Sequence, residues 1–467
     1  MGIENSTLYN EVKSVFNSGD KDAFYYWECQ LHAGGVTHSP YKLISIDTVR
    51  NFVATYSDYI VLEIAMGGGT FAHEIAPFKE DLTVTLIKTP IGMIQTSPDL
   101  EKGITSQTFR ATLIKTDLDL SSGSSTEMGN KEVADLVSIR QVRFQLQDMA
   151  LEQLRMASTG TIFRAKTGEQ IIMALLTKMS QALNVDADNQ IPGVSMVKAH
   201  NQEPREHIPI PQGMPLVDVP DYIQNKAGGI YSTGFSYYLQ KGFWYVWPTY
   251  DLSRFDTSPK TITIILLPDN RFTEVERTYR VTANQIIILI TGGTQHVDDS
   301  ESKILNEGNG VRFADSRKLM DGFSSSGDNK AIAQRTYNAT EVTAIPRANK
   351  LNMVATRKPT DNSFAEMSRL ASRNGSIMTC LWENSDIDLI RPGVPVQVIY
   401  TKDDMPVVLK ACILNLHTFT FDSSPGLDNR RHVSKTTMSL FVEKDLPELL
   451  EYKSTNPVDR YTTPSSI

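Results

Sequence analysis

The feature that most constrains the fold is an alternation of apolar and polar residues with a period of two, which returns in widely separated parts of the chain. Such a period is typical of a β-strand whose two faces meet different surroundings. Near the C-terminus it runs through Lys410–Phe421, where we expect Cys412, Leu414 and Leu416 on one face. The opposite face is expected to carry the other residues of the alternation: Ala411, Ile413, Asn415, His417, Phe419 and Phe421. We expect both faces to be partly covered.

Two regions of the sequence show this strand pattern. In the first, the alternation over Leu82–Ile87 and Phe109–Ile114 predicts half-buried antiparallel strands. In the second, strands are predicted at Val394–Thr401, Val407–Phe421 and Val433–Val442. A region of helical pattern separates the two. The sequence therefore predicts a mainly β protein with α+β insertions, and two β regions of this kind suggest two similar barrels.

The intervening region contains helical and turn signals. A helix is predicted over Asp148–Ala157, and Thr167 with Gln170 forms a capping-box pattern before a second helix. The stretch that follows can be neither a regular helix nor a central strand, because it contains four prolines. They are Pro204, Pro209, Pro211 and Pro215. Beyond them, Lys241-Gly242 connects two aromatic-rich runs and predicts a β-hairpin.

Shorter patterns near the two ends predict further elements. Apolar spacing from Leu8 to Phe16 indicates a short helix, and Ser363–Asn374 indicates another, with Ser363 and Glu366 as a capping box. The aromatic run Phe24–Trp27 fits either a core segment or a contact with a neighbouring subunit.

Composition narrows the class of protein. At 467 residues the chain exceeds the roughly 250–300 residues at which a single core stops growing, so several domains are expected. A net charge of -8 lacks the basic footprint of specific nucleic-acid binding. Cys29, Cys380 and Cys412 are too few and too scattered for a disulfide framework or a zinc site. The most apolar run, Ile286–Ile290, is far shorter than the roughly 20 residues that cross a bilayer, so we expect a soluble protein without stable membrane association.

Three short motifs resemble catalytic signatures and fail on spacing. His73-Glu74 begins a metalloprotease-like string, but Pro77 stands where the second histidine is required, and the flanking residues predict a strand. Gly67–Thr70 lacks the lysine of a phosphate-binding loop and predicts a tight turn. Gly322–Gly327 misses the nucleophile-elbow spacing by one residue and predicts a surface loop.

Histidines and paired acids complete the search for chemistry. Asp117/Asp119 and Asp386/Asp388 could serve glycoside cleavage, although any acidic chain offers such pairs. No two of the eight histidines stand at metal-ligand spacing inside a regular element: His32, His38, His73, His200, His207, His296, His417 and His432. We expect His200 and His207 in solvated loops, and His417 as a satisfied interior or interface residue. The sequence therefore assigns no catalytic, cofactor-binding or metal-binding residue, and we expect no enzyme.

Several segments together carry a family resemblance. They are Phe144–Arg155, Gly160–Arg164, the region Ile208–Asp251, and Ile390–Val396 after the helix at Ser363–Asn374. In this order and with these local patterns, they resemble the baseplate hub proteins of contractile-tailed bacteriophages. The resemblance implies two tail-tube-like antiparallel β-barrels in one chain plus accessory domains.

The resemblance also implies a function. In that family three chains form a ring of six barrels, so we expect a homotrimeric hub that adapts the hexameric tail tube to the trimeric tail spike and lines the DNA channel. The implied partners are further copies of the chain, the tail tube or tube-initiator protein, the central spike and the baseplate wedge proteins. The implied location is the virion tail baseplate, after synthesis in the host cytoplasm. Two other classes stay open: a tail-associated cell-wall hydrolase, and a generic β-rich connector or adhesin.

The resemblance and the patterns together divide the chain into segments. They are an N-terminal extension at 1–39, a first tube-like barrel at 40–130, an α+β domain with the aromatic hairpin at 131–250, a second tube-like barrel at 251–283 and 348–446, a loop-rich inserted domain at 284–347, and a C-terminal tail at 447–467.

Overall fold

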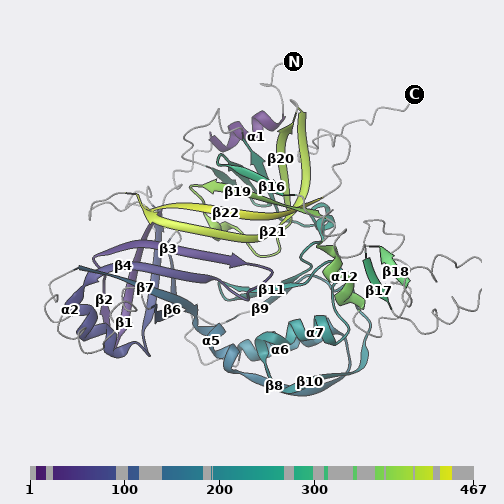
Figure 1. The fold of residues 1–467 in the computed structure, drawn as a ribbon, viewed down its shortest axis with the longest axis horizontal. Helices are drawn as coiled ribbons and strands as arrows, with labels where there is room; N and C mark the ends of the chain where they lie inside the picture. Colours follow the sequence, from purple (N-terminus) through teal and green to yellow (C-terminus); the bar gives the residue numbers. More distant parts are fainter. Residues whose placement is uncertain are drawn as a thin grey trace, which may run out of the picture.

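The computed structural model shows a mainly β protein with a few helices (Figure 1). It describes residues 7–16, 25–90, 104–114, 139–181, 191, 193–267, 278–297, 310–313, 340–343, 363–372, 375–402, 405–423 and 432–443. None of the helices within these ranges is long and apolar enough to span a membrane.

Eight strands pair in a closed cycle, which we call the strand ring. In order around the ring they are β21 (Met405–Asp422), β3 (Lys42–Asn51), β4 (Tyr59–Gly67), β7 (Ile139–Asp148), β6 (Thr105–Leu113), β5 (Thr83–Pro90), β1 (Tyr25–Ala33) and β22 (His432–Glu443). The cycle closes because β22 pairs with β21 on one side and meets β1 at Tyr25 and His432 on the other. A short strand, β2 (Val36–His38), extends β1 as a hairpin.

The interior of the strand ring is an apolar core. In β4, the residues Ile60, Leu62, Ile64 and Met66 alternate with partly exposed ones, as the period of two requires. The same alternation in β5 and β7 brings Val84 and its counterparts into this core. The predicted half-buried strands of this region are therefore confirmed as antiparallel pairs.

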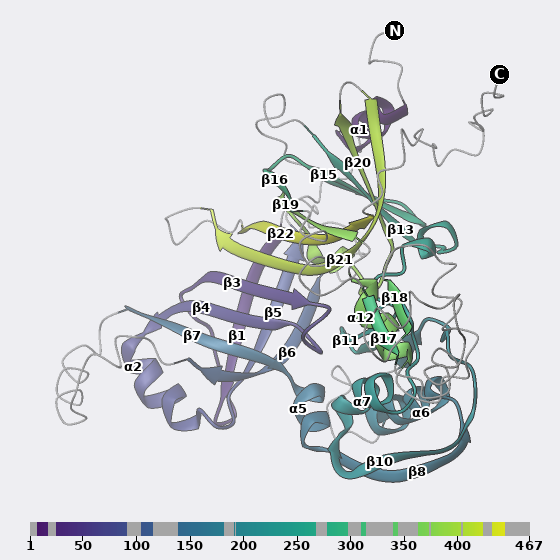
Figure 2. The same ribbon diagram turned by 45° about the vertical axis from the view of Figure 1, so that its right-hand side comes forward.

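The strands β21 and β22 also belong to a second sheet, which we call the open sheet. Its order is β14 (Tyr279–Val281), β15 (Gln285–Ile290), β13 (Thr261–Leu266), β20 (Val396–Lys402), β21, β22, β19 (Gly375–Glu383) and β16 (Thr294–Val297). Figures 1 and 2 show the β21–β22 hairpin lying between the two assemblies. The ring and the open sheet thus share two strands.

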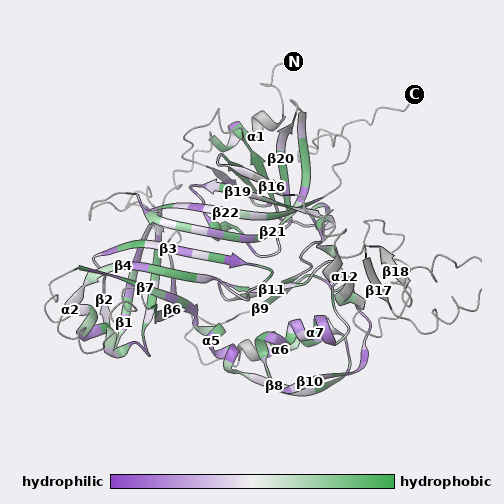
Figure 3. Cartoon of the chain, viewed as in Figure 1, coloured by the Kyte–Doolittle hydropathy of each residue, from purple (hydrophilic) through white to green (hydrophobic). Residues whose placement is uncertain are grey.

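The most apolar strand of the open sheet is covered on both faces. Within β15, Ile288 and Ile290 enter the main core, whereas Ile287 and Leu289 face the other side. There α1 (Thr7–Phe16) adds Val15 to a smaller core. Parallel pairing of β13 with β15 and β20 accompanies this double burial, which explains the unbroken apolar run in the sequence. Figure 3 shows hydrophobic colour in the part of the open sheet around β20.

An α+β region lies beside both assemblies (Figure 1). Its elements are α5 (Met149–Met156), β8 (Ser158–Lys166), α6 (Gly168–Gln181), β9 (Gly193–Met196), β10 (Arg205–Pro215), η6 (Leu216–Asp218), α7 (Val219–Lys226), β11 (Ser236–Gln240), β12 (Phe243–Trp247) and η7 (Leu252–Asp256). The strands form a β10–β8 ribbon and a three-stranded β11–β12–β9 sheet. The helices pack their apolar faces against these strands in one core.

The remaining elements are short. They are α2 (Gly68–Thr70), η2 (Phe71–Ile75), η3 (Ala76–Phe78), β17 (Gly310–Phe313), β18 (Thr340–Thr343), α12 (Ser363–Ala371) and η8 (Ile387–Leu389). The predicted helices near both ends are confirmed as α1 and α12, while the side chains of Ser363 and Glu366 lie outside the described residues.

Local signals of the α+β region are confirmed in detail. Thr167 and Gln170 form the predicted capping box, since Thr167 Oγ1 accepts from the Gln170 N–H at 3.2 Å and Gln170 Oε1 accepts from the Thr167 N–H at 3.4 Å. The predicted hairpin is β11–β12. Its turn residues Lys241 and Gly242 have φ of 47° and 75°, as a tight turn matched to the strand twist needs.

The predicted face of β21 is wrong beyond its midpoint. The alternation places Ala411 and Ile413 on the same face as His417 and Phe419, but Ala411 and Ile413 are buried together with Leu416, whereas His417 and Phe419 are exposed. The cause is a register shift between Ile413 and Asn415 in the pairing with β22. Such an irregularity exchanges the two faces of the strand, because the side-chain period is two. Leu416 therefore joins Ala411 and Ile413 in the core of the open sheet, and farther along β21 Thr418 and Thr420 line the interior of the strand ring.

Candidate functional site

The structure places the three motif-like segments as follows. His73-Glu74 lies in the π-helical turn η2, so the predicted strand there is wrong. Glu74 binds His38 at 3.1 Å between Oε2 and Nδ1. Gly67 ends β4 and Gly68 begins the helical turn α2. Gly322–Gly327 and the pair Asp117/Asp119 lie outside the described residues.

The histidines are dispersed and mostly paired with local groups. His32 contacts the hydroxyls of Thr37 and Thr85 at 2.9 and 3.0 Å. His417, with half of its side chain exposed, binds Asp47 at 2.7 Å. His200 lies in a loop as expected, whereas His207 lies in the strand β10. Among the described residues, no three histidine, cysteine or acidic side chains are arranged to hold a metal ion.

The thiols are also dispersed. Cys29 and Cys380 are buried and all three cysteines are free. Burial raises the pKa of Cys29 and of Cys380 to about 12, so both thiols stay protonated and poorly nucleophilic near neutral pH.

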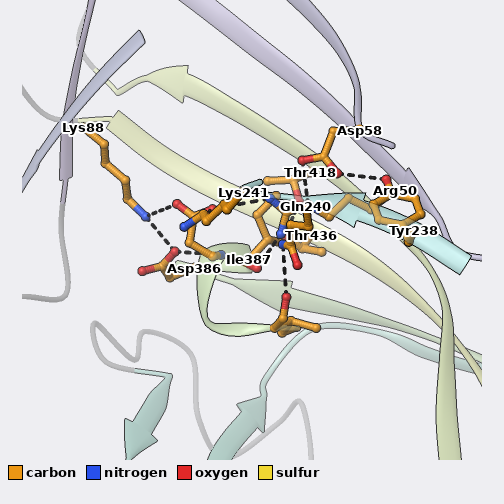
Figure 4. A network of polar contacts seen from close by, with 12 residues as sticks. Arg50, Asp58, Lys88, Tyr238, Gln240, Lys241, Asp386, Ile387, Thr418 and Thr436 are labelled. Atoms are coloured by element: carbon orange, nitrogen blue, oxygen red, sulfur yellow. Dashed lines mark hydrogen bonds and ion pairs between the residues drawn. The ribbon is translucent and has the colours of Figure 1, made fainter. Parts of the chain in front are cut away.

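Asp386 and Asp388 are the one predicted acid pair that the described structure contains, and they form the centre of a buried ion network (Figure 4). Both belong to the turn around η8, where the Asp386 side chain caps the turn by accepting from the Asp388 N–H at 3.1 Å. Lys88 Nζ lies 2.6 Å from Asp386 Oδ1 and 2.9 Å from Asp388 Oδ2. Lys88 follows Val84 and Leu86 on the inward face of β5, so the strand's alternation carries its charge into the ring.

Arg50 adds a second cation to the ion network. Its Nε donates to Asp58 at 3.0 Å, Nη2 to Asp388 at 3.3 Å, and Nη1 to the Ile387 carbonyl at 2.6 Å. Arg50 is 4% exposed and lies on the inward face of β3, as Lys88 does on β5. Two strands of the strand ring, β3 and β5, thus contact the η8 turn, which connects β19 and β20 of the open sheet.

The aromatic hairpin supplies the third side of the network. Lys241, at the tip of the β11–β12 turn, lies 3.2 Å from Asp388, and Tyr238 donates to Asp58 at 2.8 Å. Gln240 donates to the Ile390 carbonyl at 3.3 Å. Residues from the strand ring, the η8 turn and the α+β region therefore meet at one point.

The charges in this network hold one another ionised. Burial alone would raise the pKa of Asp388, but Lys88, Lys241 and Arg50 outweigh it and hold that pKa well below its usual range. Burial likewise would lower the pKa of Lys88, and Asp388 and Asp386 raise it. A carboxyl with a lowered pKa cannot donate a proton near neutral pH, so Asp388 is unsuited to general acid catalysis. The arrangement is suited to joining parts of the molecule.

A cavity of about 450 Å³ lies beside the network, inside the end of the strand ring. Tyr25 and Trp27 of β1 line it, and Lys88 Nζ lies 3.9 and 5.6 Å from the centres of their rings. These aromatic rings further stabilise the buried ammonium group. Tyr25 and Trp27 belong to the aromatic run for which the sequence left two interpretations; within this chain both residues face the interior.

His432 lies where the strand ring closes, beside Tyr25 of β1. Its burial predicts that the stability of the protein depends on pH. It is 5% exposed, and its Nδ1 accepts from the Trp27 backbone N–H at 3.2 Å. Burial lowers its pKa, Asp422 opposes this and Lys42 adds to it. The unfolded chain therefore binds a proton that the folded chain does not in the interval below about pH 6.5.

We expect the free energy of unfolding to fall as the pH drops from 7.5 to 5.5, by at most about 1.4 kcal/mol per pH unit from this residue. Urea unfolding at several pH values measures the slope. His432→Gln should flatten it, and the exposed His207→Gln serves as the matched control with an unchanged slope. An equal slope in all three proteins would contradict the assignment.

The chain is similar to known proteins in structure, whereas the comparisons of its sequence find no match. No protein-family model matches the chain. No curated protein sequence matches it either. A tail protein from Neisseria meningitidis is similar at 14% identity and a TM-score of 0.42, over 89% of this chain and 96% of the other. An E. coli component of the type VI secretion system is similar at 10% identity and a TM-score of 0.41, over 89% and 77%. A prophage tail protein from Shewanella oneidensis is similar at 10% identity and a TM-score of 0.43, over 88% and 96%.

Proposed function

We propose that the chain is a structural protein of a bacteriophage tail: a homotrimeric baseplate hub that adapts the hexameric tail tube to the trimeric tail spike and lines the DNA channel. In this proposal the strand ring is one tube-like unit and the open sheet takes the place of the second, and three chains place six such units in one ring. The hub acts without catalysis or a cofactor, and its location is the virion baseplate.

The observation that carries the proposal is the connection of the two β assemblies through shared strands and buried ion pairs. They share the strands β21 and β22, and the buried contacts of Lys88 and Arg50 with Asp388 fix their junction. A threefold assembly can imitate sixfold geometry only if the two repeating units within one chain keep a fixed orientation. A shared hairpin with a buried ion network meets that requirement, whereas a flexible linker would not.

The partners follow from the same role. The hub would contact further copies of itself, the tube or tube-initiator protein, the spike and the wedge proteins. Its net charge of -8 suits a channel wall, because a strongly basic wall would hold the phosphates of passing DNA.

The mass of the purified protein in solution tests the proposal. We expect a species of three times the 52.1 kDa chain mass, measured by native mass spectrometry or sedimentation, and a larger complex when the tail spike protein is added. A strict monomer that ignores both spike and tube would overturn the hub.

Two controls address the alternative classes. Clearing of host cell wall in a zymogram would favour the tail-associated hydrolase. Direct binding of the isolated protein to host cells would favour the adhesin. The hub should show neither activity.

A further inference from the structure

Both outer edges of the two-stranded β10–β8 ribbon are unpaired within the described part of the chain. β8 pairs with β10 through Ser158–Lys166, and no other strand in the described part of the chain pairs with β8. Figure 2 shows the ribbon at the periphery of the α+β region, outside α6 and α7. An edge of this kind presents a row of N–H and C=O groups that can pair with a further strand.

The two strands of the ribbon differ in their proline content. β10 contains Pro209, Pro211 and Pro215, which lack the N–H that a partner strand needs. β8 contains no proline in its nine residues. Proline is a common means of protecting an edge from unwanted pairing. Prolines therefore protect the edge of β10 from pairing with a further strand, whereas the edge of β8 has no such protection.

The end of the ribbon at Lys166 is basic. Lys166 lies opposite Arg205, and Arg164 lies opposite His207, so basic residues face basic residues across the two strands. Like charges directly opposite each other destabilise a β-pair. Glu206 approaches His207 at 4.0 Å, but its side chain is 92% exposed and offers little compensation. A second copy of β8 would add further basic residues and be repelled, whereas an acidic segment would neutralise them.

The other half of β8 offers space and apolar surface. The register shift between Ile210 and Met214 leaves an open hollow of about 450 Å³ along Ser158–Ile162. Ile162 is 61% exposed beside it. An incoming strand could therefore place an apolar side chain against Ile162 and acidic side chains farther along, near Arg164.

We propose that β8 binds an extended, acidic segment of a partner protein, which adds to the ribbon as a third strand. Backbone hydrogen bonds along β8 supply the affinity, and the basic end of the ribbon selects acidic partners and sets their register. The proposal rests on the ribbon alone and is independent of the hub function.

A short peptide in which glutamate and valine alternate is the probe, used with the full chain. We expect it to bind, by fluorescence anisotropy, and to protect amides of residues 158–166 from hydrogen exchange. A lysine–valine peptide should not bind. The double variant Arg164→Glu, Lys166→Glu should weaken binding of the acidic peptide at least tenfold. The matched control Arg143→Glu, Lys260→Glu changes two exposed basic residues elsewhere and should leave it unchanged.

A backbone N-methylated form of the same acidic peptide separates strand addition from simple charge attraction, and it is tested on the unaltered protein. We expect its binding to be lost. Equal binding of the methylated peptide would overturn the proposal, as would the absence of binding by the acidic peptide. Concentration-dependent protection of residues 158–166 without any peptide would also overturn it, because it would identify a second copy as the occupant.

Discussion

Replacing Asp388 with asparagine is expected to lower the free energy of unfolding by about 3–5 kcal/mol. The Asp388 carboxylate contacts Lys88, Arg50 and Lys241, at 2.9, 3.3 and 3.2 Å, and its side chain is 21% exposed. Asparagine keeps the shape but removes the charge that holds three cations in place. The cost is large because Lys88 and Arg50 remain buried with less compensation. Chemical denaturation of the wild type and the variant measures the difference.

A matched substitution exists on the surface. Asp256 binds Lys410 at 2.5 Å, but its side chain is 61% exposed. Asp256→Asn should therefore cost less than about 1 kcal/mol. Similar losses for the two variants would mean that the network at Asp388 contributes no more than a surface ion pair.

A second large loss is expected from Trp382→Ala, which should lower the free energy of unfolding by about 3–5 kcal/mol. Trp382 is fully buried in the core of the open sheet and contacts Tyr279 edge to face. Its Nε1–H donates to Thr278 Oγ1 at 2.8 Å, so alanine creates a cavity and removes a hydrogen bond. Denaturant unfolding measures the change.

Trp382→Phe separates the two contributions, since it keeps most of the ring and loses the N–H donor. The hydrogen bond itself is worth about 1 kcal/mol, so this variant should lose much less stability than alanine does. If phenylalanine costs as much as alanine, the polar contact rather than the packing dominates at this position.

Local signals in the sequence predicted elements well. The capping box at Thr167 and the turn at Lys241-Gly242 depend on residues within a few positions of each other, and both are present in the structure. The period of two predicted the strands β5 and β6, because each of them has one face in a core.

The pairing of strands that are far apart in the sequence could not be predicted from such local signals. The register shift after Ile413 left no local mark, and it reversed the faces of half a strand. The sequence also did not indicate that β7 pairs with β4 and β6, that β1 pairs with β5, or that β21 and β22 complete the strand ring. These pairings depend on which edges meet in space.

The ion network was missed for a related reason. Asp386 and Asp388 were noticed as a pair, but Lys88 precedes them by about 300 residues and reads as one polar position in an alternating strand. A lysine on the inward face of an otherwise apolar strand is the signal that could have found it. Lys88 follows Val84 and Leu86 in that register, and a buried lysine requires an acidic partner.

The closure of the strand ring orders events during synthesis of the polypeptide. β1 and β3 leave the ribosome well before β21 and β22 do, because the contacting residues Asp47 of β3 and His417 of β21 are separated by 370 residues. Until β21 and β22 have emerged, the edges of the early strands keep unpaired backbone N–H and C=O groups, which favours slow completion of the strand ring. A chain interrupted before β22 cannot finish either assembly. Only polypeptides that contain β22 would then become available to the partners of the proposed assembly.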